Sequence, residues 1–132
     1  MIGDNDILLA EWKEIRETLR YFGNNRFAQL TVFLAAEGAT IGGFLKEPPP
    51  AQPLVLQIAG ILLSLLFLIM EYSSVLYWDK FAERGESIER SVKVLKMMTE
   101  YRPKEHGLLS GTNATYGLYV ATLIFWCTTF IW

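Results

Sequence analysis

The residues of this sequence that could do chemistry are polar side chains set inside apolar stretches. The clearest is Glu37, the only carboxylate in the segment FLAAEGATIGG, residues 33–43. A charged acid at the middle of a bilayer costs on the order of 3 kcal/mol on insertion scales, so such a residue needs a role. It could bind a proton or cation, or line a pore as a carboxylate ring if copies surround an axis. The alternative is a protonated acid that joins helices by hydrogen bonds.

Further polar residues recur at intervals of seven in two other apolar stretches. Because seven residues make about two helical turns, each set lies on one face of a helix. If the two stretches run antiparallel, counting inward at about 1.5 Å per residue puts their polar residues at three shared depths. The spacing predicts a polar ladder with three rungs: Gln57 with Thr129, Ser64 with Thr122, and Glu71 with Thr115.

Depth also predicts partners for the two acids. Glu37 lies eight residues before Leu45, roughly 12 Å into the membrane. That is near the level of Ser64 and Thr122, whose hydroxyls are expected to receive its carboxyl. Glu71 lies near the inner interface at the level of Arg26, which is expected to neutralise it. Hydroxyl stripes of this kind are more often helix-packing contacts than a conduction path.

Other kinds of site have little support. The single Cys127 excludes a disulfide framework and a multi-cysteine metal site within the chain. His106 has no second metal ligand at a useful spacing. The net charge of −2 comes from mixed charges rather than a basic stripe, so nucleic-acid binding is not expected. We therefore expect no catalytic, cofactor or metal site, and a protein that is not an enzyme.

The charge distribution defines the elements that must position these residues. Of the 12 Lys and Arg and 14 Asp and Glu, all but Glu37, Lys46, Glu47 and Glu71 lie in residues 1–26 and 79–105. Three nearly uncharged stretches remain, and each approaches the ~20 residues that a helix needs to cross a bilayer. The sequence predicts an all-α membrane protein with transmembrane helices over residues 27–45, 54–78 and 114–132. The first stretch is not expected to be a cleaved signal peptide.

Basic residues predict the orientation. Eleven Lys and Arg fall in the two charged blocks, and Lys46 alone falls in the linker KEPPPAQP. By the positive-inside rule, the amino terminus and the 79–113 loop are cytoplasmic and the carboxyl terminus is outside, as in a bacterial inner membrane. The aromatic belts at the interfaces are expected to include Tyr77, Trp78, Trp126 and Trp132.

Two amphipathic helices are expected on the cytoplasmic side. Residues 7–22 place Leu8, Trp12, Ile15 and Leu19 on one stripe, and a break or bend is expected at residues 23–25. Residues 79–101 repeat the pattern as an extension of the second span, with Gly85 as a bend. We expect the two apolar stripes to meet.

The first span has a face of small residues. Ala35, Gly38, Ala39 and Gly42 share it, whereas large residues surround Glu37 on the opposite face. Small residues four apart let another helix approach closely. This face is therefore expected to pack against protein.

Two resemblances add to this interpretation. The run LLAEWKEIRETLRYFGNNRFAQLTVFLAAEGATIGGF, together with RPKEHGLLSGTNATYGLYVATLIFW, resembles small bacterial multi-span membrane proteins of the RipA-like octameric group. That resemblance implies a homo-oligomer and no established chemistry.

The architecture is also similar to bacterial diacylglycerol kinase, which has intramembrane glutamates and a Trp-Cys pair like Trp126-Cys127. Its second-span signature of Glu, Asn and Glu is here Glu71, Ser74 and Trp78. Two of its three functional residues are therefore replaced.

The sequence leaves two main hypotheses. One is an oligomeric membrane protein that conducts ions or controls permeability, with Glu37 as its central residue. The other is a non-catalytic structural or accessory subunit that docks on other membrane subunits through its small-residue face. A lipid kinase is a distant third. The lipid bilayer is the partner common to all of them.

Overall fold

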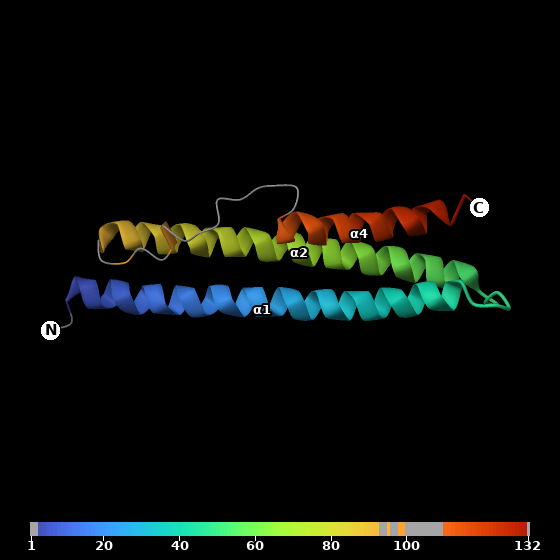
Figure 1. The fold of residues 1–132 in the computed structure, drawn as a ribbon, viewed down its shortest axis with the longest axis horizontal. Helices are drawn as coiled ribbons and strands as arrows, with labels where there is room; N and C mark the ends of the chain where they lie inside the picture. Colours follow the sequence, from blue (N-terminus) through green and yellow to red (C-terminus); the bar gives the residue numbers. More distant parts are fainter. Residues whose placement is uncertain (1–2, 93–94, 96–97, 100–109, 132) are drawn as a thin grey trace. The chain divides into compact units, whose positions relative to one another are not determined.

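The computed structural model describes residues 3–92, 95, 98–99 and 110–131. All regular structure in this part of the chain is helical, which confirms the all-α class. The helices are α1, Asp4–Phe44, α2, Pro53–Ser91, and α4, Gly111–Thr128 (Figure 1).

The helix α1 is continuous through 41 residues. The sequence predicted separate helices over 7–22 and 27–45, so the break expected at residues 23–25 was wrong. A glycine inside a helix costs only about 1 kcal/mol relative to alanine. No proline lies within residues 4–44 to force a break.

The helix α2 joins the span expected over 54–78 to part of the helical extension expected over 79–101, as predicted. It passes through Gly85 as helix but ends at Ser91 rather than at 101. The last predicted span, 114–132, corresponds to α4. Trp132, His106 and the expected helix end near residues 100–103 lie outside the described residues.

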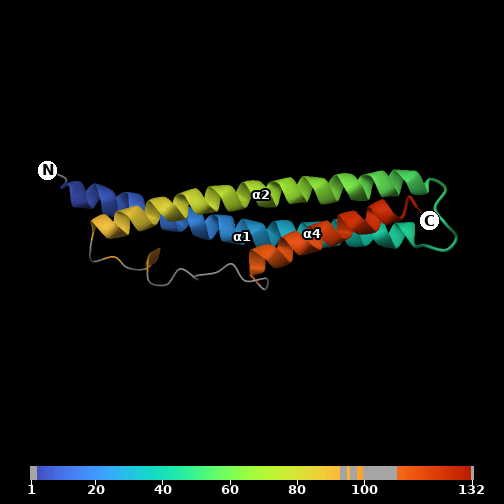
Figure 2. The ribbon, with the colours of Figure 1, turned by 90° about the horizontal axis from the view of Figure 1, so that it is seen from above.

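The chain divides into two compact units. The first consists of Met1–Asn25 and Ser73–Glu105, and the second of Arg26–Tyr72 and His106–Trp132. In the first, the start of α1 lies beside the end of α2 (Figure 2). The predicted apolar stripes meet there in a core of Trp12, Ile15 and Ile88, bordered by Leu8, Leu19, Phe81, Val92, Leu95 and Met98.

A buried carboxylate explains why α2 ends early. The Glu89 side chain, 2% exposed, accepts hydrogen bonds from the indole Nε1 of Trp12 at 3.1 Å and from the backbone N–H groups of Met98 and Thr99 at 2.7–2.9 Å. It thereby caps a turn that begins after α2 has ended. A Cβ at Gly85 would lie 2.2 Å from the Met98 sulfur, so the missing side chain leaves room for that turn.

We predict that Glu89→Ala destabilises this unit by about 2–4 kcal/mol, because the buried Trp12 indole and the partly buried N–H groups of Met98 and Thr99 lose their acceptor. Thermal unfolding followed by circular dichroism in detergent measures the effect. Glu83→Ala, at an exposed position of the same helix, is the control. Equal melting temperatures for the two variants would contradict the capping role.

A surface ion pair also joins the two helices of the first unit. Arg84 donates from Nε and Nη2 to the two oxygens of Glu11 at 2.7 and 2.9 Å. This hydrogen bond, aided by the charge of Arg84, lowers the pKa of the Glu11 carboxyl from its ordinary value. A carboxyl with a lowered folded-state pKa stabilises the fold above its unfolded pKa, and that contribution is lost as the pH falls through the folded value.

We predict that Arg84→Gln raises the pKa of Glu11 toward its ordinary value, whereas Arg90→Gln leaves it unchanged. Arg90 pairs with Glu86 on its own helix and is the matched control. A pH titration of the labelled glutamate carboxyl by NMR measures both variants. A Glu11 pKa that does not respond to Arg84→Gln would refute the pair.

Two of the helices are long and apolar enough to cross a membrane, namely α1 and α2. Only 11% and 22% of their most apolar 18-residue windows are buried inside the protein. The exposed side chains there are large and apolar, including Leu34, Leu62, Leu66 and Ile69. The helix α4, with 18 residues, is shorter than the ~20 expected of a full span.

Candidate functional site

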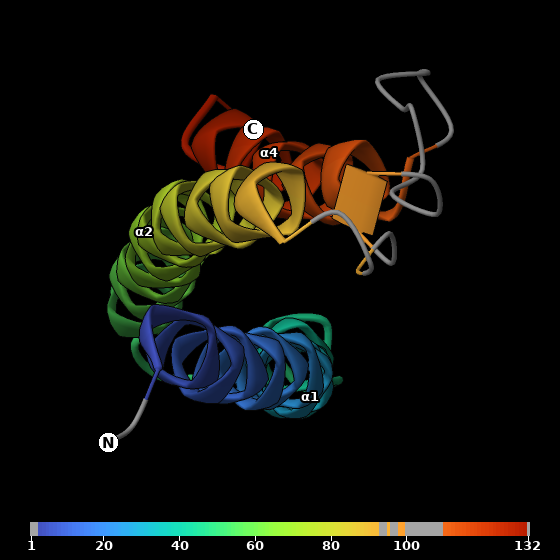
Figure 3. The same cartoon turned by 90° about the vertical axis from the view of Figure 1, so that its left-hand side faces the viewer.

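Glu37 belongs to the second unit, to which α1, α2 and α4 all contribute residues. Figure 3 shows these three helices from one end of the molecule. The Glu37 side chain is 3% exposed. One carboxyl oxygen, Oε1, accepts a hydrogen bond from Ser64 Oγ of α2 at 2.9 Å, and the other, Oε2, accepts one from Trp126 Nε1 of α4 at 2.8 Å. The carboxyl thus connects all three helices.

The expected contact of Glu37 with Ser64 is present, but the one with Thr122 is not. The Thr122 hydroxyl donates to the Leu118 carbonyl of its own helix at 2.8 Å instead. Trp126, which we placed in an aromatic belt, is fully buried and takes the position expected of Thr122. The available signal was that Trp126 lies one turn from Thr122 on the same face of α4.

The small residue Gly60 makes this arrangement possible. A Cβ at Gly60 would lie 2.0 Å from Cε2 of the Trp126 ring, so the indole rests directly on the backbone of α2. Phe44 packs edge-on against the same indole, with ring centroids 5.5 Å apart. The indole is therefore held with its N–H pointing at the carboxyl.

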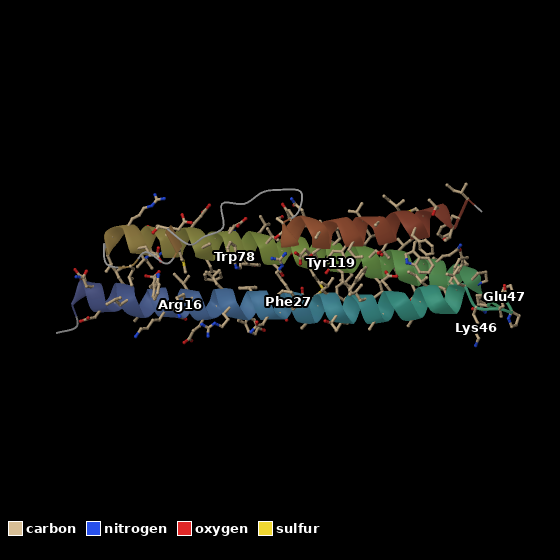
Figure 4. The ribbon with its side chains drawn as sticks, in the orientation of Figure 1. Arg16, Phe27, Lys46, Glu47, Trp78 and Tyr119 are labelled. Atoms are coloured by element: carbon tan, nitrogen blue, oxygen red, sulfur yellow. The ribbon has the colours of Figure 1, made fainter. Side chains whose placement is uncertain are left out.

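A layer of aromatic rings borders Glu37 on the side that faces Arg26 and Glu71. Phe33, Phe67 and Tyr119 form a buried cluster with ring centroids 4.6–6.2 Å apart. Tyr119 lies on α4 between the helices, whereas Phe27 of α1 is 75% exposed (Figure 4). The layer separates Glu37 from the next polar group along the helices.

That next group is the ion pair expected from the sequence. Glu71 is 1% exposed and accepts a hydrogen bond from Arg26 Nη2, which also donates to Thr112 Oγ1 of α4 at 3.2 Å. Thr115, the residue predicted at this level, instead donates to the carbonyl of Gly111 in its own helix. The pair therefore joins three helices, with Thr112 as the residue the sequence interpretation missed.

The predicted contact between Gln57 and Thr129 is present, but it uses the backbone of Thr129 rather than its side chain. Gln57 Nε2 donates at 3.0 Å to the backbone carbonyl of Thr129, while the Thr129 hydroxyl donates to Trp126 O. Only this rung of the predicted ladder joins α2 to the expected residue, because Ser64 and Glu71 find their partners, Glu37 and Arg26, on α1 instead. The three threonines predicted for the ladder, Thr115, Thr122 and Thr129, direct their hydroxyls to carbonyls three or four residues earlier.

The small-residue face of α1 is open. Ala35, Gly38, Ala39 and Gly42 are all exposed, and a Cβ added at either glycine would meet no atom within 4 Å. None of the packing inside the second unit uses this face. Lys46 and Glu47 lie in the exposed connection that follows α1 (Figure 4).

The arrangement can hold charge and protons but offers little else chemically. Within the described ranges, no group of three or more His, Cys, Asp and Glu lies close enough to hold a metal ion. Cys127 is exposed on α4. No protein-family model, no curated protein and no solved structure matches the chain.

We predict that Gly60→Ala destabilises the second unit by about 1–3 kcal/mol, since the added methyl group displaces the Trp126 ring. Gly117→Ala on α4 is the control, because a Cβ there meets open space. It should be neutral or stabilising, as alanine favours helix. Thermal unfolding in detergent separates the two, and equal melting temperatures would contradict the contact.

Proposed function

We propose that this chain is a non-catalytic integral membrane protein that works as a homo-oligomeric scaffold. One observation carries the proposal: the intramembrane carboxyl is bonded inside the chain, whereas the small-residue face of α1 is left open. Within the described residues, the buried carboxyls of Glu37 and Glu71 have hydrogen-bond donors from the same chain. The open small-residue face is the surface that we propose another helix covers.

The proposed topology has three spans in a bacterial inner membrane with a cytoplasmic amino terminus. Supporting this, α1 and α2 have the length and apolarity of spans. The 18 residues of α4 cover about 27 Å at 1.5 Å per residue, close to the ~30 Å hydrocarbon core. The Arg26–Glu71 pair then lies at the inner interface.

Ion conduction through Glu37 is less well supported. A carboxylate ring requires each carboxyl to face a shared water-filled axis. The Glu37 side chain instead faces Ser64 and Trp126 of the same chain, and the ring cluster of Phe33, Phe67 and Tyr119 lies beside it. This geometry favours the structural role for Glu37.

A second copy is the partner we propose for the open face. Glycines four apart allow two helices to approach until their backbones touch, which is the main route to specific association in lipid. The resemblance to the RipA-like octameric group also implies self-association. The same face would serve an accessory subunit of a larger complex, which is the alternative.

We predict that the double variant Gly38→Leu, Gly42→Leu lowers the molar mass of the detergent-solubilised protein toward the 15.1 kDa of one chain. A Cβ at either position meets no atom within 4 Å, so we expect the leucines to block association rather than folding. Light scattering coupled to size exclusion measures the mass. Ala121→Leu, at an exposed position of α4, is the control for adding an apolar side chain outside this face.

Four results would contradict this proposal. A monomeric wild type would remove the homo-oligomer, and other proteins copurifying in fixed ratio would favour the accessory subunit. Unchanged assembly in the double variant would exclude this face. A proton or cation leak in reconstituted vesicles that Glu37→Gln abolishes would instead support conduction.

A further inference from the structure

The two oxygens of the Glu37 carboxyl face donors of different chemistry. Trp126 Nε1 carries a hydrogen that can only be donated, and it lies 2.8 Å from Oε2. Ser64 Oγ, 2.9 Å from Oε1, has one hydrogen and two lone pairs, so it can donate or accept. A proton on Oε1 would therefore find a hydrogen-bond acceptor, whereas a proton on Oε2 would face a donor.

The charged and titratable groups around Glu37 do not remove this difference between its two oxygens. On the cytoplasmic side, Arg26 of α1 and Glu71 of α2 are paired with each other, and the Phe33–Phe67–Tyr119 layer lies between that pair and Glu37. Tyr116 and Tyr119 are the titratable groups that α4 adds there, and Cys127 of α4 is exposed. Toward the other end, Lys46 and Glu47 are exposed. No described Lys or Arg forms an ion pair with Glu37.

We propose that Glu37 and Ser64 form a binding site for a single proton, which goes beyond the scaffold role. The proton binds Oε1 and is donated to Ser64 Oγ, while Oε2 remains the acceptor of the Trp126 N–H. A proton on Oε2 would have no acceptor, because the nearest polar atom there is a donor.

The Ser64 hydrogen has a defined destination in the protonated state. When Ser64 becomes an acceptor, its own hydrogen turns to the carbonyl of Gly60, four residues earlier on the same helix. Ser91 and Thr122 already donate to carbonyls four residues earlier in this chain, at 3.1 and 2.8 Å. One proton is thus gained or released while both contacts that hold the helices are kept.

Infrared spectroscopy of the reconstituted full chain over a range of pH tests the proposal. We expect a C=O band of a protonated carboxyl that Glu37→Gln removes and that Glu83→Gln, at an exposed site, leaves in place. Gln is isosteric with the protonated acid, so the fold should be retained. Because Oε2 is the carbonyl oxygen, Trp126→Phe should raise the band frequency more than Ser64→Ala does.

The same spectra can overturn the proposal. Absence of such a band at every pH at which circular dichroism shows a folded protein would mean that no proton binds. A band that survives Glu37→Gln would place the proton on another carboxyl. A larger shift in Ser64→Ala than in Trp126→Phe would place it on Oε2. None of these results depends on the oligomeric state, so the scaffold proposal can fail separately.

Discussion

A carboxyl group removed from water must find hydrogen-bond donors within the protein, and much of this structure depends on that requirement. Burial of an unsatisfied polar group costs several kcal/mol, and of an unpaired charge considerably more. Glu37, Glu71 and Glu89 are each at most 3% exposed. Each is satisfied by a different means: a hydroxyl with an indole, a guanidinium, and an indole with backbone N–H groups.

These carboxyls also define the register of the helices. Apolar side chains can slide past one another with little change in contact, whereas a hydrogen bond holds only over a few tenths of an ångström. In the second unit, polar contacts alternate with aromatic packing: the Gln57 contact, the Trp126 indole, the Glu37 carboxyl, the ring cluster and the Arg26–Glu71 pair. The bonds select one register, and the rings fill the space between them.

Sequence reasoning found the elements and half of the polar contacts. Periodicity and charge clustering located the apolar helices, and depth counting paired Arg26 with Glu71 and Glu37 with Ser64. It failed for Thr122, Thr115 and Trp126. Equal depth does not reveal which way a helix is rotated about its axis, and a threonine can satisfy its hydroxyl within its own helix. The role of Gly60 is visible only once Trp126 is seen against it.

The end of α2 was missed for a related reason. Residues beyond Ser91 still follow a helical apolar pattern, so nothing local predicts a stop. The stop depends on Glu89, whose carboxylate receives backbone groups from nine and ten residues later in the chain. An interaction of that kind is tertiary in origin, and local propensity cannot report it.

The contact of Trp126 with Gly60 and Glu37 has a consequence for the order of events during synthesis. The helices α1 and α2 precede α4 in the chain, so among the described residues Ser64 is the donor that Glu37 can reach before α4 packs. Until then, Oε2 of Glu37 lacks the Trp126 N–H, and the surface of α2 at Gly60 lacks the ring that covers it. The indole supplies both contacts at once, so burial of Glu37 with two donors requires α4 to be in place.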